Sequence, residues 1–171
     1  MSIRATALGV AACDADHRVR EEGGNNKGPR IRQYLQNVDP PINAAAPWCA
    51  AAVQYWSDVA ARVLGMENPL DAVRLEALVQ SYYEGLGHNE VAPYEARPGD
   101  LVLFEFNEAG RWNHIGLLAQ PPNPQGHFWT VEGNTSDENQ RDGDAVAVKP
   151  RDLNAGYPVV FLTWGDGEAT E

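Results

Sequence analysis

The sequence predicts an α+β domain, in which N-terminal helices pack on a C-terminal antiparallel sheet of about five strands. The first half of the chain has apolar residues at helical spacing, whereas the second half has short strand-like runs between Gly- and Pro-rich turns. The length of 171 residues fits one domain of ordinary size. We therefore expect a single domain over residues 1–165 and a flexible tail over residues 166–171.

Four helices are expected before the sheet. Ala7, Leu8 and Ala11 give the first helix its apolar spacing. Pro29 and Pro47 suit the first turns of the second and third helices, because the N–H that proline lacks would be unpaired there in any case. The predicted helices cover residues 5–20, 29–35, 47–64 and 71–83.

Strands are expected beyond Pro98-Gly99-Asp100, where the helical spacing ends. Each run is rich in β-branched, aromatic or other apolar residues and is bounded by turn residues. The predicted strands cover residues 101–106, 113–119, 127–133, 145–149 and 159–164.

The charge balance excludes several classes of partner. The chain has 13 Lys and Arg against 24 Asp and Glu, a net charge of −11. A strongly acidic surface does not favour nucleic acid phosphates or anionic lipid. The longest apolar run has ten residues, 44–53, whereas a membrane-spanning helix needs about 20. We expect neither nucleic acid binding nor membrane insertion.

The N-terminal region carries no clear signal peptide. Its alanine-rich stretch after Arg4 is short, although Val10-Ala11-Ala12-Cys13 is similar to a lipoprotein cleavage box. A first helix of the domain is the simpler interpretation. We therefore expect synthesis in the cytoplasm without a clear signal peptide.

Cys49 is the first candidate for chemistry. The chain has only two cysteines, Cys13 and Cys49, too few for a disulfide scaffold or a four-thiolate zinc site. Cys49 follows Pro47-Trp48 in the first turn of a predicted helix. The free N–H groups and partial positive charge of a helix start stabilise a thiolate and can hold an oxyanion. The alternative is an inert buried cysteine.

A thiolate nucleophile needs a base, and the chain has four histidines. His17, His88 and His127 lie in or beside a helix, a loop and a turn. His114 begins a predicted strand, and Gly116 leaves the sheet face beside it open. His114 is therefore the candidate base, with a histidine merely packed at a strand end as the alternative.

Glu132 and Asn134 are candidates for the group that orients the base. They would share one face of the third strand if the strand extends that far. Either side chain can accept the second ring N–H of a histidine and fix its tautomer. The alternatives are a solvated carboxylate at a sheet edge and a turn asparagine beside Gly133.

The order of these segments is similar to that of a known family. The matching stretches are Glu22-Gly23-Gly24-Asn25-Asn26-Lys27-Gly28-Pro29, Pro47-Trp48-Cys49-Ala50-Ala51, Arg97-Pro98-Gly99-Asp100-Leu101-Val102, Asn113-His114-Ile115-Gly116 and Val131-Glu132-Gly133-Asn134-Thr135. Together they resemble the CHAP domain, the cysteine- and histidine-dependent amidohydrolase/peptidase group of the papain-like superfamily. The resemblance covers about residues 5–164.

This resemblance implies a papain-like fold and hydrolysis of an amide bond in bacterial peptidoglycan. The bond would be the N-acetylmuramoyl-L-alanine amide or one in the stem peptide or cross-bridge. By position, Cys49 is the nucleophile, His114 the general base and then acid, and Glu132 orients the imidazole with help from Asn134. Trp48 and Asn26 are candidate substrate contacts, with core packing as the alternative for Trp48. Asn26 and Asn43 are candidates for the second oxyanion donor.

No metal or other cofactor is expected. Some CHAP domains hold calcium through acidic residues just before the cysteine, but residues 43–46 contain no carboxylate. The acidic residues of the 137–144 loop do not follow an EF-hand pattern. Cys13 and His17 are four residues apart on a predicted helix, and two ligands alone do not make a metal site.

The expected partner is bacterial peptidoglycan, reached through a delivery apparatus such as a holin, a tail particle or a secretion system. An immunity protein would be a further partner if the protein is a toxin. Two other functions stay open. One is a catalytically silent CHAP-like module of a phage tail or secretion system. The other is a thiol amidase acting on a small molecule.

Overall fold

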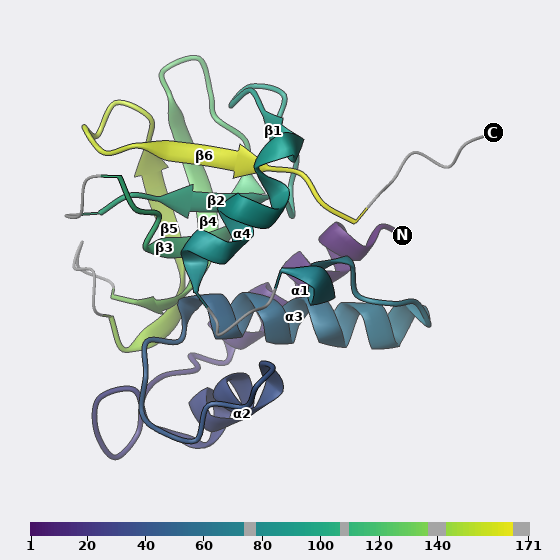
Figure 1. Ribbon diagram of the computed structural model, residues 1–171. Coiled ribbons are helices and arrows are strands. Elements are labelled where there is room, and N and C mark those ends of the chain that lie inside the picture. Colours follow the sequence, from purple (N-terminus) through teal and green to yellow (C-terminus); the bar gives the residue numbers. More distant parts are fainter. Residues whose placement is uncertain (74–77, 107–109, 137–142, 166–171) are drawn as a thin grey trace.

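The computed structural model describes residues 1–73, 78–106, 110–136 and 143–165. The described residues form an α+β structure with four α-helices and a six-stranded antiparallel sheet. Figure 1 shows three of the helices grouped below the sheet and the fourth, α4, in front of it. The predicted fold class is therefore confirmed at the level of α+β. The predicted tail, residues 166–171, lies outside the described residues.

The helical layer is built around one central helix. The helices are α1 (Ile3–Asp16), α2 (Pro29–Asn37), α3 (Cys49–Leu64) and α4 (Val79–Leu86), with 3₁₀ turns at Pro69–Ala72 and Gly87–Asn89. Helix α3 packs against α1, α2, β3 and β4, and much of its surface is buried. It ends at Gly65, which adopts the left-handed conformation that closes many helices. Among the described helices, none is long and apolar enough to cross a membrane.

The sheet does not follow chain order. Its strands are β1 (Glu90–Val91), β2 (Leu101–Phe104), β3 (His114–Gln120), β4 (His127–Thr135), β5 (Ala145–Asp152) and β6 (Val159–Leu162), arranged β1-β6-β2-β3-β4-β5. Strand β6 returns to pair with both β1 and β2. The last strand of the chain therefore lies inside the sheet.

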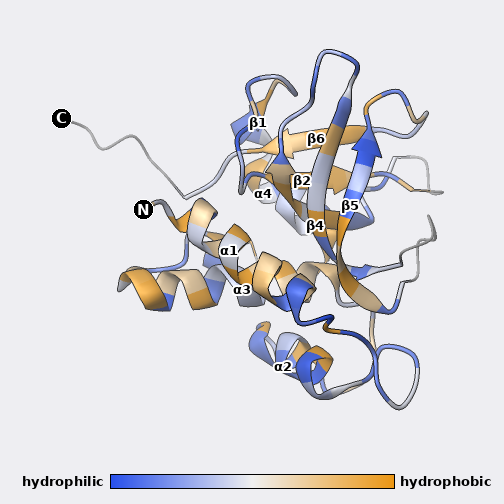
Figure 2. Ribbon diagram, turned by 180° about the vertical axis from the view of Figure 1, so that it is seen from behind, coloured by the Kyte–Doolittle hydropathy of each residue, from blue (hydrophilic) through white to orange (hydrophobic). Residues whose placement is uncertain are grey.

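The two faces of the sheet bury different apolar clusters. Ile115, Leu117 and Val131 belong to the large core shared with the helices. Successive side chains on a strand point to opposite faces of the sheet, and the alternate residues, including Phe104 and Phe128, form a smaller cluster on the other face. Figure 2 shows the hydrophobic ribbon of β2 and β6 within the sheet, whereas α2 is mostly hydrophilic.

Three elements differ most from the sequence prediction. The short strand β1 was not predicted, because two residues are too few to show a period of two. Helix α1 ends at Asp16 rather than near residue 20. The helix predicted over 71–83 is confirmed only over its last part, since a 3₁₀ turn ends at Ala72 and α4 runs from Val79 to Leu86.

Candidate active site

Cys49 is the first residue of α3, and it is 6% exposed. Trp48 is the N-cap residue, and its side chain makes no capping hydrogen bond. The first helical bond runs from the Ala52 N–H to the Trp48 carbonyl at 2.9 Å. The N–H groups of the first turn, Cys49 included, have no carbonyl partner within a helix. These donors suit an oxyanion formed beside the thiol.

His114 is the first residue of β3, and its side chain is buried. The ring lies beside Phe104 and Phe106, with centroid distances of 5.9 and 5.6 Å. Its Nε2 lies 2.7 Å from Glu132 Oε2, and Cys49 interacts electrostatically with the same ring. Because Glu132 occupies Nε2, Nδ1 is the nitrogen left to face the thiol.

Glu132 lies on β4 and has no exposed surface. Besides His114, it accepts hydrogen bonds from Thr130 Oγ1 at 2.5 Å and Arg151 Nε at 2.7 Å, and from a second guanidinium nitrogen of Arg151. These four bonds match the capacity of one carboxylate. The rotamer of Glu132 is therefore fixed from several sides.

Charge controls the protonation of this buried group of residues. Burial opposes ionisation of Glu132, but the charge of His114 and the hydrogen bonds from His114 and Arg151 hold the pKa of Glu132 well below its usual range. Burial also opposes the protonated form of His114. The Glu132 charge and the hydrogen bond with Cys49 outweigh it and raise the pKa of His114 to about 9. At neutral pH the imidazole is therefore cationic.

Two glycines allow the elements of the site to approach one another. A Cβ atom at Gly116 would lie 2.6 Å from Glu132 Cγ, so the open space predicted beside His114 is filled by the Glu132 side chain. A Cβ atom at Gly133 would lie 2.8 Å from the Trp48 ring and 2.9 Å from Ala52 Cβ. Gly133 thus lets the start of α3 rest directly on β4.

Arg151 and Thr130 belong to this site and were not predicted from the sequence. Strand β5 pairs Lys149 with Thr130 and Arg151 with Phe128, so Arg151 extends along the same face toward Glu132. Its guanidinium group also lies 5.0 and 5.2 Å from the ring centroids of Phe104 and Phe106. The predicted strand stopped at residue 149, two residues short of Arg151. Period-two spacing from Lys149 would have placed Arg151 on this face.

Two predicted site residues have other positions. Trp48 has no exposed surface, since its ring stacks on Tyr34 with centroids 5.6 Å apart and its Nε1 donates to Glu21 at 3.0 Å. The expectation that Trp48 contacts substrate is therefore corrected, because the ring supports the start of α3 from within the core. Asn134 is buried with φ of +53° beside a bulge. Among the described residues, it is not a hydrogen-bond partner of the His114 ring.

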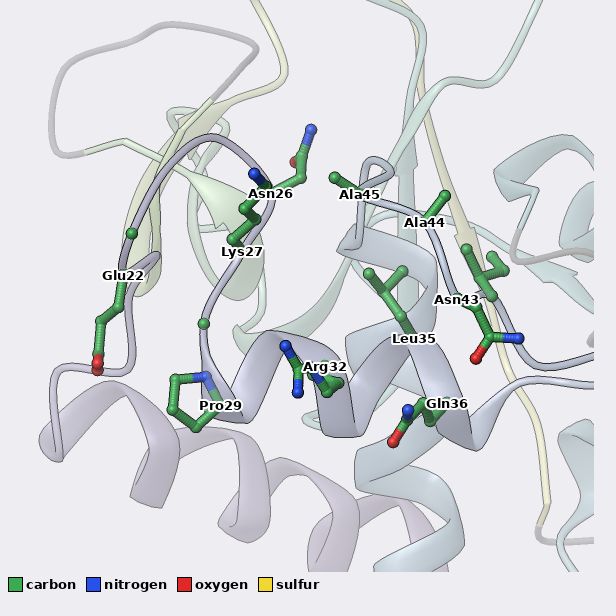
Figure 3. Close-up of a pocket in the computed structure, with 13 residues that line it drawn as sticks. Glu22, Asn26, Lys27, Pro29, Arg32, Leu35, Gln36, Asn43, Ala44 and Ala45 are labelled. Carbon is green, nitrogen blue, oxygen red and sulfur yellow. The ribbon is translucent and has the colours of Figure 1, made fainter.

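A groove lies on the side of the molecule that carries α2. Its volume is about 820 Å³, and Asn26 and Asn43 are among its lining residues. Figure 3 shows the groove between the loop that carries Asn26 and the segment that carries Asn43, Ala44 and Ala45. The two candidate oxyanion donors thus line one groove.

The remaining histidines do not join the Cys49 site. His17 Nδ1 lies 3.5 Å from Cys13 Sγ, and both residues are exposed. His127 lies 3.3 Å from Asp152, and His88 is exposed. Within the described ranges, no three metal-ligating side chains gather at one point. Most of the acidic 137–144 loop lies outside those ranges.

Comparison with known proteins adds no relative from which function can be transferred. No protein-family model matches the chain, and no curated protein matches it either. The function must therefore be inferred from the chemistry of the buried residues Cys49, His114 and Glu132 and of the partly buried Arg151.

Proposed function

We propose that this protein is a cysteine-dependent amidase or endopeptidase with a papain-like, CHAP-type fold, and that it hydrolyses an amide bond of bacterial peptidoglycan. The observation that carries the proposal is the buried His114 ring, which Glu132 holds through Nε2 at 2.7 Å and which interacts electrostatically with Cys49 at the start of α3. A nucleophile, a base and an orienting carboxylate in this order are the parts that thiol acyl transfer needs.

Acylation starts from the thiolate of Cys49 and the imidazolium of His114. The thiolate sulfur attacks the amide carbonyl carbon, and the carbonyl π electrons move to the oxygen. The N–H groups at the start of α3 stabilise this oxyanion. The intermediate then collapses, the C–N bond breaks, and the ring proton of His114 passes to the leaving amine. A thioester on Cys49 and a neutral imidazole remain.

Deacylation reverses the role of the imidazole. His114 takes a proton from water, and the resulting hydroxide attacks the thioester carbonyl. The C–S bond breaks, the acid product leaves, and the thiolate–imidazolium pair is restored. Throughout the cycle the ionised Glu132, held by Arg151, keeps the ring in one orientation and one tautomer.

Peptidoglycan is proposed as substrate on the basis of the motif order and its resemblance to CHAP domains. The net charge of −11 disfavours nucleic acid and anionic lipid as alternatives. The proposal places the reaction at the cell wall or periplasm, after delivery by another system, with an immunity protein as a further partner if the protein is a toxin. No metal is proposed to take part.

The substrate is tested with purified sacculi and defined muropeptides. The wild-type protein should release soluble fragments, and mass spectrometry of the new termini should identify the cleaved bond. Cys49→Ala should abolish release, whereas Cys13→Ser should not change it. Release by Cys49→Ala would contradict the nucleophile. Hydrolysis of a small soluble amide without any release from sacculi would contradict peptidoglycan as substrate.

The activated thiol is tested separately by alkylation. Cys13 also lies near a histidine, so the experiment uses the Cys13→Ser background. Iodoacetamide should label Cys49 at pH 6 and below in this background, and His114→Ala should slow the labelling about tenfold or more. Equal rates with and without His114 would favour the catalytically silent module.

A further inference from the structure

We propose that the groove over α2 is the subsite for a short peptide that carries a free carboxylate and small aliphatic side chains, with Arg32 and Lys27 as the carboxylate partners. This inference rests on the proposed function, because the peptide would be part of the same substrate. The groove volume of about 820 Å³ lies within the range of small-ligand sites.

Both walls of the groove connect to residues next to Cys49. Ala45, which lines the groove, precedes Cys49 by only four residues, so their Cα atoms are at most about 14 Å apart. On the other wall, Glu21 adjoins the loop and accepts a hydrogen bond from Trp48 Nε1 at 3.0 Å. A peptide of a few residues can therefore reach from the groove to the thiol.

The charge of the groove is opposite to that of the whole molecule. Lys27 and Arg32 line it together with one carboxylate, Glu22, and neither cation has an ion-pair partner in the part of the chain that the structure describes. In Figure 3, the Arg32 side chain rises from α2, whereas the Glu22 carboxylate points away from Asn26. An arginine with free N–H groups binds a carboxylate through two parallel hydrogen bonds.

The uncharged lining residues suit a peptide rather than a free anion. Asn26 and Asn43 offer amide donors and acceptors from opposite walls, as peptide groups require. Leu35 and Ile42 supply apolar surface between them. The adjoining Ala44 and Ala45 leave room for methyl-sized side chains. Together these residues select an alanine-like residue next to a carboxylate.

The decisive experiment compares two forms of one peptide substrate, with its carboxylate free or amidated. The wild-type protein should prefer the free form in kcat/KM. Arg32→Gln should reduce this preference about tenfold, and Lys27→Gln should reduce it less, because a lysine makes no bidentate contact. Arg62→Gln is the matched control, since Arg62 is an exposed arginine on α3 that does not line the groove. It should leave the preference unchanged.

A binding measurement separates this inference from the proposed function. Isothermal titration of the Cys49→Ala variant with the two peptides reports affinity without turnover. Stronger binding of the free form that is lost on Arg32→Gln supports the groove, even if the wild-type protein cleaves no peptidoglycan. Cleavage of sacculi together with equal affinity for both peptides in the Cys49→Ala variant overturns the groove while the proposed function stands.

Discussion

At the scale of single residues, the Glu132 carboxylate links the base of the site to its surroundings. It binds His114 on one side, Thr130 and Arg151 on the others, and it has no contact with solvent. A group held in this way stays ionised, and its charge in turn keeps the His114 ring protonated. Glu132 therefore controls the protonation of His114, although it is separated from the Cys49 thiol by the His114 ring.

The pH dependence of acylation should follow from this charge. His114 has a pKa of about 9, so the imidazolium persists below pH 9 and is lost above it. The rate should fall on that alkaline side, because the leaving amine then lacks its proton donor. Glu132→Gln removes the charge that raises this pKa, so it should move the alkaline limb to lower pH and reduce kcat/KM about 100-fold or more.

The control for that experiment is Glu90→Gln, a change of an exposed carboxylate on β1. It should leave the pH–rate profile where it is. An alkaline limb that stays near pH 9 in Glu132→Gln would contradict the role given to this carboxylate.

Arg151 should affect the opposite limb of the profile. It supplies hydrogen bonds and charge that lower the pKa of Glu132, so Arg151→Gln should let Glu132 take up a proton at higher pH than in the wild type. The acid limb of the pH–rate profile should therefore move to higher pH. Removing one partner of a buried ion pair should also lower the free energy of unfolding by about 3–5 kcal/mol, as measured by urea denaturation.

Arg151→Lys distinguishes charge from geometry at the same position. Lysine keeps the positive charge but not the planar fork, so the acid limb should stay closer to its wild-type position than in Arg151→Gln. Identical shifts in the two variants would show that charge is not what Arg151 contributes.

At the scale of elements, the contact between α3 and β4 brings Cys49, the proposed nucleophile, to the sheet that carries His114. Gly133→Ala would force a methyl group into Trp48 and Ala52. It should lower the free energy of unfolding by about 1–3 kcal/mol, since overpacking a buried contact has this cost. It should also slow the alkylation of Cys49 in the Cys13→Ser background, because the start of α3 must move away from β4.

Gly9→Ala is the matched control for this prediction. Gly9 lies within α1, and nothing lies within 4 Å of an added Cβ atom there. The substitution should raise the free energy of unfolding by about 0.5–1 kcal/mol through helix propensity, with no change in alkylation. A stability loss for Gly9→Ala equal to that for Gly133→Ala would contradict the crowding assigned to Gly133.

At the scale of the whole molecule, Asp14 joins the three helices below the sheet. This buried carboxylate on α1 accepts hydrogen bonds from Arg30 at 2.5 Å, Tyr34 at 2.7 Å and Trp56 at 2.9 Å. Arg30 and Tyr34 belong to α2, and Trp56 belongs to α3. Because the Tyr34 ring stacks on Trp48, this junction also supports the start of α3 beside the thiol.

Asp14→Asn should weaken the entire helical layer. It leaves Arg30 without its counter-charge and one donor without a good acceptor, so we expect a loss of about 2–4 kcal/mol in the free energy of unfolding. Asp16→Asn, two residues further along α1 and exposed, should change it by less than about 0.5 kcal/mol. Similar losses for the two variants in a denaturant titration would contradict the special role of Asp14.

The sequence predicts those parts of the site that depend on local signals. Pro47 predicts a helix start, and α3 begins two residues later at Cys49. The apolar run after His114 predicts β3 correctly, with the histidine at its first residue. Such features depend on neighbours within a few positions, so one sequence is sufficient to find them.

Features that depend on distant partners are not predicted. Arg151 reaches Glu132 only because β5 lies beside β4, a pairing that no short pattern encodes. Asn134 departs from the alternation of its strand because a bulge and a left-handed φ intervene. The position of Trp48 next to the nucleophile does not reveal that its ring turns inward against Tyr34.

The division of the site between α3 and three later strands also has a consequence for synthesis. The thiol emerges from the ribosome well before the histidine, and the carboxylate and guanidinium groups follow still later. An incomplete chain therefore holds a thiol without its base or the charges that govern that base. Under the proposed function, cleavage therefore begins only when nearly the whole domain has been translated and has folded, so that an unfinished chain is inactive inside the cell that makes it.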